Sequence, residues 1–247
     1  MEESFMASEF IDSPLLRKQT RYKGYPALEA KYRDKQGSIF YVRYLIQGPH
    51  YYTLVAHGKQ EIPEMQRFLQ SFEIIPLQYR AAKPEKDTAL YFSVQTPVFP
   101  VDKKIKLDIP RYNVTGDDEE EETEMQQLES GAFRNKIIAN DSTGEKIYVS
   151  FFKASRYHYS DDSSRLSRDS GFYYRDDSSW IIKKYKKTEL SGNRKVWDML
   201  VTDTGSSRAI WYKTFYKDGV TFTLTSLTDT LTPPGDFTRQ FYETFLP

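Results

Sequence analysis

Hydrophobic and polar positions alternate most clearly between residues 220 and 225. Val220, Phe222 and Leu224 are separated by threonines, a period of two that is typical of a strand with one buried face. Asp218-Gly219 lies just before this run, and an Asp-Gly pair between two apolar runs favours a tight hairpin turn. The pattern therefore predicts a β-hairpin formed by residues 209–216 and 220–227.

A second hairpin is predicted nearer the N-terminus. Residues 39–46 and 51–56 are rich in apolar and aromatic side chains, and Gly48-Pro49 lies between them as a turn signal. Tyr52-Thr53-Leu54 in this hairpin matches Phe222-Thr223-Leu224 in the other. The two hairpins therefore share sequence as well as predicted shape.

An amphipathic helix is predicted after each hairpin. Pro63 suits the first turn of a helix, where its missing N–H costs nothing. Apolar residues follow it at helical spacing, namely Met65, Phe68, Leu69 and Phe72. After the second hairpin the same stripe consists of Phe237, Phe241 and Phe245. We expect both stripes to pack against a sheet.

The resemblance between the two halves extends beyond the hairpins. Residues 13–18 are similar to residues 179–184, and a glycine follows each segment, Gly24 or Gly192. Residues 32–38 likewise correspond to residues 200–206. The sequence therefore predicts a duplicated strand-hairpin-helix unit, although two ordinary units obeying the same amphipathic rules would also look alike.

The two copies are expected to differ in completeness. Residues 77–88 are polar and lack an apolar period, so we place the boundary there and assign residues 1–78 to the first unit and 89–247 to the second. Residues 90–99 predict a strand, and residues 133–139 with 147–152 predict another hairpin, as opening strands of the second unit. The first unit has no such strands.

Two explanations fit the lack of opening strands in the first unit. Either the chain begins in the middle of a longer protein, or the first copy has degenerated to a half-unit that borrows the other's sheet. In both cases a sheet that lacks its opening strands keeps an open edge, and an open edge needs covering.

Composition agrees with a fold dominated by sheet. The chain holds 19 Tyr and 16 Phe, residue types that favour half-buried strands, so we expect an α+β fold with antiparallel sheets flanked by helices. Lys and Arg together number 35, as do Asp and Glu, so no overall field attracts nucleic acid. No run approaches the roughly 18–20 apolar residues of a membrane-spanning segment.

Signatures of catalysis are missing from the sequence. The absence of cysteine excludes disulfides, thiolate nucleophiles and Cys-ligated metals. Three histidines are present, but no G-x-S-x-G, H-E-x-x-H or glycine-rich phosphate loop accompanies them. The sequence therefore predicts a protein that is not an enzyme and has no cofactor or metal site.

One stretch nevertheless carries weak candidates for ligand binding. These are Tyr157, His158, Tyr159, Asp161, Asp162, Tyr173, Tyr174 and Trp180. Their amphipathic rings suit an interface or a sugar platform, although half-buried sheet residues explain them as well. If His158 meets the nearby carboxylates in a pocket, the alternative function is a small-ligand or carbohydrate-binding protein, or a hydrolase.

An acidic run lies between the predicted strands of the second unit. Seven of the eight residues from 117 to 124 are Asp or Glu. Such residues repel one another, so we predict a solvated surface loop. A surface that collects cations or a basic partner is the alternative.

With the repeat laid out, each unit resembles the C-terminal part of the PsbP-like superfamily of small α/β sandwich proteins. The strand before Gly24 or Gly192, the hairpin and the Phe-bearing helix carry this resemblance, and together they cover about half of the chain. The resemblance implies a central antiparallel sheet flanked by helices and a non-catalytic role in binding or assembling other proteins, often outside the cytoplasm. The truncated first copy and the acidic insertion depart from the pattern.

The sequence thus predicts a non-enzymatic binding or assembly module. We expect it to hold a protein partner on a sheet face or between its two units, and to belong to a larger extracytoplasmic protein, periplasmic or on the cell surface. The absence of cysteine is equally compatible with the cytoplasm.

Overall fold

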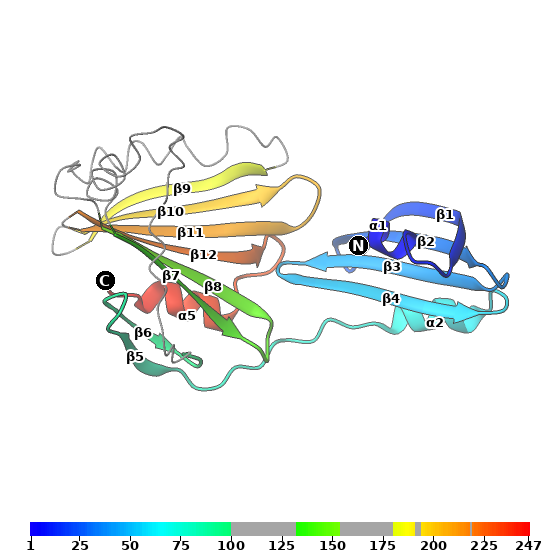
Figure 1. Cartoon of the computed structure of the whole chain (residues 1–247), viewed down its shortest axis with the longest axis horizontal. Coiled ribbons are helices and arrows are strands. Elements are labelled where there is room, and N and C mark those ends of the chain that lie inside the picture. The colour runs from blue at the N-terminus through cyan, green and yellow to red at the C-terminus, as the bar shows by residue number, and fades with distance from the viewer. Residues whose placement is uncertain (100–131, 154–179, 191–193, 218) are drawn as a thin grey trace, which may run out of the picture. The chain divides into compact units, whose positions relative to one another are not determined.

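The computed structural model describes residues 1–99, 132–153, 180–190, 194–217 and 219–247 (Figure 1). The chain divides into two compact units. Unit 1 consists of Met1–Leu77 with the short segments Thr204–Arg208 and Asp229–Pro233. Unit 2 consists of Gln78–Asp203, Ala209–Thr228 and Pro234–Pro247.

Unit 1 is built on a four-stranded antiparallel sheet with strand order β1-β2-β3-β4. Its elements, in chain order, are α1 (Glu2–Met6), β1 (Ile11–Tyr22), β2 (Tyr25–Asp34), β3 (Ile39–Gln47), β4 (His50–Gly58) and α2 (Pro63–Ser71). Strands β3 and β4 confirm the hairpin predicted for residues 39–46 and 51–56, with Arg43 opposite Leu54. Pro63 opens α2, as its position in the sequence predicted.

The sheet of unit 1 carries apolar side chains on both faces. On one face, Phe5 from α1 packs on Ala30, Tyr32, Val42 and Tyr44. On the other, Met65 and Leu69 from α2 pack on Tyr41. The helical stripe predicted for α2 is therefore confirmed at Met65 and Leu69 but wrong at Phe68, whose side chain is 51% exposed. Phe68 instead lines an open hollow between α2 and β4.

Unit 2 is built on a six-stranded sheet with strand order β7-β8-β12-β11-β10-β9, and a separate β5-β6 hairpin. The strands are β5 (Lys83–Asp87), β6 (Phe92–Thr96), β7 (Ala132–Asn140), β8 (Glu145–Lys153), β9 (Trp180–Leu190), β10 (Arg194–Asp203), β11 (Arg208–Lys217) and β12 (Val220–Asp229), followed by helix α5 (Asp236–Thr244). The pairing of β7 with β8 and the adjacency of β11 and β12 agree with both hairpins that the sequence predicts in this unit.

Strand β5 is a feature that the sequence pattern missed. It lies within residues 77–88, where the polar composition predicted a connection, because its residues, Lys-Pro-Glu-Lys-Asp, are all polar or proline. The strand observed near residues 90–99 is also shorter than predicted, from Phe92 to Thr96. Antiparallel sheet dominates the described residues, with only short helices beside it.

The core of unit 2 lies between one face of the six-stranded sheet, α5 and β6. Phe237 and Phe241 of α5 and Phe245 directly after it are all buried in this core, which confirms the predicted stripe. The ring of Phe245 stacks on Phe92 of β6 at a centroid distance of 4.9 Å and lies 5.0 Å from Phe215 of β11. Helix α5 is therefore covered by β6 as well as by the sheet.

A buried polar cluster fixes the start of α5. The Glu145 carboxylate accepts hydrogen bonds from the hydroxyls of Thr143 and Thr238, at 2.9 and 3.2 Å. Glu145 and burial together raise the pKa of the neighbouring Tyr79 hydroxyl, burial being the larger cause. Gly235 precedes α5 at the same place, where an added Cβ would meet Tyr79 and Glu145. A side chain at position 235 would therefore displace the Tyr79 hydroxyl and the Glu145 carboxylate.

Candidate functional site

Most of the ligand-binding residues predicted from the sequence lie outside the described residues, so their role stays a prediction. These are Tyr157, His158, Tyr159, Asp161, Asp162, Tyr173 and Tyr174. The acidic run from 117 to 124 also lies outside them. Trp180 is described: it begins β9 and packs, partly buried, against a cluster of Trp197, Met199, Val201 and Tyr216. Trp180 therefore makes packing contacts, and its role in ligand binding stays a prediction.

The described part of the chain contains neither a metal-binding cluster nor a membrane-spanning helix. Within it, no group of three or more His, Asp or Glu side chains is arranged to hold a metal ion. Likewise, none of the helices described is long and apolar enough to cross a membrane. A candidate binding surface is found on unit 1.

The two edges of the sheet in unit 1 differ in how well they are protected. Strand β1, at one edge, contains Pro14, two register shifts and several exposed cationic side chains, all of which discourage a further strand from pairing. Strand β4, at the other edge, contains no proline and no Lys, Arg, Asp or Glu. It pairs with β3 in unbroken register and has no second neighbour among the described strands. Strand β4 is therefore the edge that can accept another strand.

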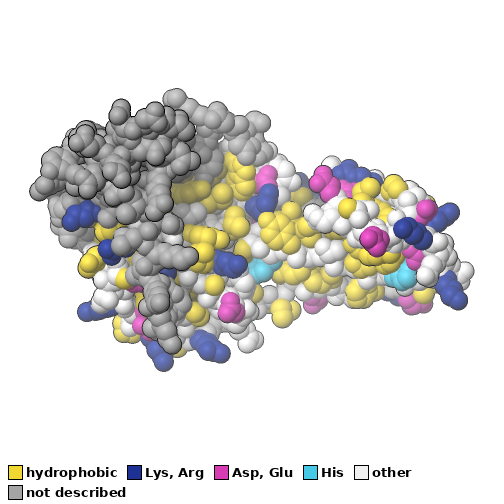
Figure 2. Space-filling view, in the orientation of Figure 1, with side chains coloured by type: hydrophobic (Ala, Val, Ile, Leu, Met, Phe, Trp, Pro, Cys, Tyr) yellow, Lys and Arg dark blue, Asp and Glu magenta, His cyan; other side chains and the backbone are white. Residues whose placement is uncertain are grey.

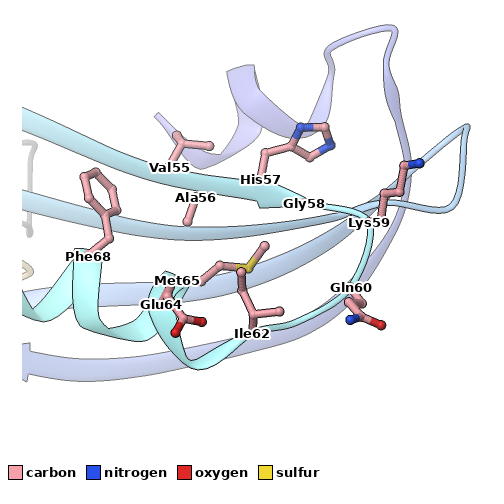
Figure 3. A pocket seen from close by; sticks show the side chains of 10 residues that line it. All are labelled: Val55, Ala56, His57, Gly58, Lys59, Gln60, Ile62, Glu64, Met65 and Phe68. Carbon is pink, nitrogen blue, oxygen red and sulfur yellow. The ribbon is translucent and has the colours of Figure 1, made fainter.

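An open hollow of about 640 Å³ lies beside this edge, between β4 and α2 (Figure 3). It is lined by Val55, Ala56, His57, Gly58, Lys59, Gln60, Ile62, Glu64, Met65 and Phe68. Figure 3 shows Ala56 and Met65 on the helix side of β4, whereas Val55 and His57 project to the opposite side. We call the free edge of β4 and this hollow together the β4 groove.

Apolar side chains dominate the wall that α2 contributes to the β4 groove. Phe68 and Ile62 are exposed there despite their size. Met65 approaches the backbone at Gly58 closely, because a Cβ on Gly58 would lie 2.5 Å from the Met65 methyl carbon. Figure 2 shows further hydrophobic side chains at the surface of unit 1, interspersed with charged ones. An apolar wall beside a free strand edge is the combination found where extended peptides bind.

His57 marks the end of the β4 groove and is held by two contacts. Its Nε2 lies 3.0 Å from Asp34 Oδ2, and its ring stacks on Phe40 at 4.0 Å. The other Asp34 oxygen accepts backbone N–H bonds from Gln36 and Ser38. Burial raises the pKa of Asp34, but the hydrogen bonds from His57, Ser38 and Gln36 outweigh it and lower the pKa overall. The pair therefore joins the end of β4 to the turn after β2, a structural role.

Helix α2 is held in place by a buried arginine. Arg43 on β3 lies directly opposite Glu29 on β2, with 2.6 Å between Nη2 and Oε1. Its Nη1 donates to the carbonyl oxygen of Leu69 in the last turn of α2. The Tyr22 ring lies 4.2 Å from the guanidinium, and its hydroxyl shares its one proton between the carbonyl oxygens of Phe72 and Gln70, at 2.7 and 2.9 Å. Helix-end carbonyls have no partner within their own helix, so these bonds fix α2 against the sheet.

Unit 2 contains the same arrangement of charges. Asp198 on β10 lies directly opposite Lys213 on β11, and Lys213 Nζ donates to the carbonyl oxygen of Tyr242 at 2.8 Å. Tyr242 lies in the last turn of α5. Burial lowers the pKa of Lys213, and Asp198 and Glu243 oppose that shift. In both units, then, a basic residue opposite an acidic one holds the end of the helix that follows the hairpin.

Sequence reasoning missed the β4 groove as a site, although one signal pointed to it. The expectation of an open edge came from the absence of opening strands in the first unit. No motif indicated that Phe68 would be exposed, or that Asp34 and His57, 23 residues apart, would meet. A scan of the sequence against protein-family models finds no match, and a search of curated proteins finds no significantly similar sequence.

Proposed function

We propose that this chain is a non-enzymatic protein-binding module and that unit 1 holds its partner in the β4 groove. The observation that carries the proposal is the combination of an unprotected strand edge with an apolar hollow. Strand β4 offers backbone N–H and C=O groups along its free edge, and Phe68 stands exposed beside it. Exposed edges of this kind are normally blocked in proteins that do not use them.

A protein partner suits this surface better than a small molecule. Sites for small molecules are usually enclosed, with a few converging polar groups. The hollow between β4 and α2 is open, and its polar side chains, such as Lys59 and Glu64, lie among apolar ones without converging on one point. A row of free backbone groups, by contrast, is useful only to another extended chain.

The proposal includes duplication of one strand-hairpin-helix unit. Its support is that β1 to β4 with α2, and β9 to β12 with α5, follow the same order along the chain. The acidic and basic residues that hold the helix end also occupy matching strands, Glu29 and Arg43 in one unit and Asp198 and Lys213 in the other. Membership of the PsbP-like superfamily and an extracytoplasmic location belong to the same proposal and rest on the sequence resemblance.

Site-specific photocrosslinking tests the proposed function. A photoreactive phenylalanine analogue replaces Phe68 in the full chain, and a matched variant carries it at Leu15, which is exposed on the opposite edge of the same sheet. Irradiation in extracts of the source cells should yield a discrete adduct from position 68 and none from position 15. Identical adducts from both positions, or none from either, would contradict the proposal. Circular dichroism establishes that both variants fold.

A further inference from the structure

We infer that the partner segment is an extended strand that adds antiparallel to β4 and carries apolar side chains at three alternate positions. This inference rests on the proposed function and names the chemistry of the partner. Its basis is unit 2, where the strand that corresponds to β4 already has a further strand paired with it. Strand β8 occupies it and serves as the template for the partner.

The strand in unit 2 that corresponds to β4 is β12, which is not an edge. Strand β8 pairs antiparallel with it, so that Phe151 lies opposite Phe222 and Val149 opposite Leu224. Ile147, Val149 and Phe151 all belong to the core around α5, whereas Lys146 before them and Tyr148 between them are exposed. The β8 strand thus contributes three alternate apolar side chains to the space between β12 and α5.

The same register can be transferred to β4. Tyr52-Thr53-Leu54 matches Phe222-Thr223-Leu224 in sequence, which makes Tyr52, Leu54 and Ala56 the counterparts of Phe222, Leu224 and Ser226. A strand added like β8 would place its three apolar side chains opposite these residues. Ala56 lines the hollow, and Ser226 lies opposite Ile147 in unit 2. The hollow therefore lies where the counterpart of Ile147 would insert.

Helices α2 and α5, which follow the two corresponding hairpins, differ in what covers them. Phe241 of α5 is fully buried, with its ring 6.3 Å from Phe92 of β6. Its counterpart by sequence in α2 is Phe68, which is 51% exposed. Among the described residues, unit 1 has no strands corresponding to β5–β8. The helix of unit 1 thus keeps exposed an apolar side chain of the kind that the additional strands cover in unit 2.

A synthetic hairpin peptide with the sequence of residues 132–153 is the probe for this inference. It is labelled with a fluorophore and titrated with the full-length chain while anisotropy is measured. A second peptide exchanges Ile147, Val149 and Phe151 each with its preceding neighbour, which is Lys146, Tyr148 or Ser150 respectively. This exchange moves the apolar set to the other face of the strand at constant composition.

The inference predicts saturable binding of the first peptide and none of the second. Phe68→Asp should raise the Kd roughly tenfold or more, as loss of an aromatic contact at the centre of an interface does. Leu15→Asp, on the opposite edge, should leave the Kd unchanged. Equal binding of both peptides, or binding that Phe68→Asp does not weaken, would overturn the inference.

Failure of the inference can be distinguished from failure of the proposed function. A specific crosslink at position 68 together with no hairpin binding would retain a protein partner but reject an added strand. No crosslink and no hairpin binding would reject both. Light scattering of the chain alone gives the remaining outcome: a dimer abolished by Phe68→Asp would assign the β4 groove to a second copy and overturn the inference.

Discussion

Replacement of Arg43 by methionine is expected to release α2 from unit 1. The Arg43 and Glu29 side chains are only 7% and 17% exposed, so this ion pair is largely shielded from water. Methionine preserves much of the apolar length of the side chain but removes the charge and the hydrogen bond to Leu69. The substitution therefore leaves the Glu29 carboxylate with only a long hydrogen bond from the Tyr41 hydroxyl, at 3.5 Å, and removes the donor from the Leu69 carbonyl.

The burial of the Arg43–Glu29 ion pair determines how much stability Arg43→Met is expected to remove. Removing one partner of a buried ion pair costs about 3–5 kcal/mol, and the residual exposure of Glu29 places the expectation at the lower end, about 3 kcal/mol. A change of about 3 kcal/mol corresponds to an increase of roughly a hundredfold in the equilibrium constant for local opening. The effect should be concentrated in α2, because Arg43 bonds its last turn.

Hydrogen–deuterium exchange resolves this effect along the chain. In Arg43→Met, the amides of α2 should exchange roughly a hundredfold faster, while those of α5 keep their protection. Arg17→Met is the matched control, because Arg17 pairs with Glu2 on an exposed surface and does not touch α2. Unchanged protection of α2 in Arg43→Met would refute the role assigned to Arg43.

Two further substitutions test local features of the fold. Gly235→Ala should destabilise unit 2 by about 1–3 kcal/mol, since its Cβ would overlap Tyr79 and Glu145, and Tyr79→Phe in the same chain should restore part of the loss in a urea titration. An unaltered midpoint would contradict that packing. Because the pKa of Asp34 is lower in the folded protein, its carboxylate stabilises unit 1 at pH values above its unfolded pKa of about 4. This contribution is lost as the pH falls through the folded pKa. Asp34→Asn should therefore flatten the fall in melting temperature below about pH 4, and equally steep profiles for the two proteins would disprove the contribution.

The elements that the sequence predicted well are those defined by local periodicity. Alternation around Phe222 and the Asp-Gly turn were sufficient for the hairpin of β11 and β12, and helical spacing was sufficient for the Phe stripe of α5. Both patterns reflect a single buried face, which a short window of sequence can reveal. Strand β5 was missed because its residues are polar or proline and show no apolar alternation, although its partner β6 begins only five residues after its end.

Features that depend on distant contacts could not be predicted in the same way. Phe68 obeys the helical period of α2, yet it is exposed because no described strand of unit 1 covers it as β6 covers Phe241. The bond from Arg43 to Leu69 joins residues that are 26 positions apart. A long charged side chain in a strand normally indicates an exposed position, whereas Arg43 is buried by its partners. The open edge was the one part of the site that the comparison of the two copies indicated.

The most direct test of the proposal that a partner strand pairs with β4 is amide hydrogen exchange in β4 itself. The full chain is saturated with the hairpin of residues 132–153, and exchange is compared with that of the free protein. Pairing of a strand with the free edge predicts slower exchange at alternate residues of β4, with β1 unaffected. If β4 exchanges at the same rate in both states while the hairpin is bound, the partner does not add to this edge, and strand addition to unit 1 is contradicted.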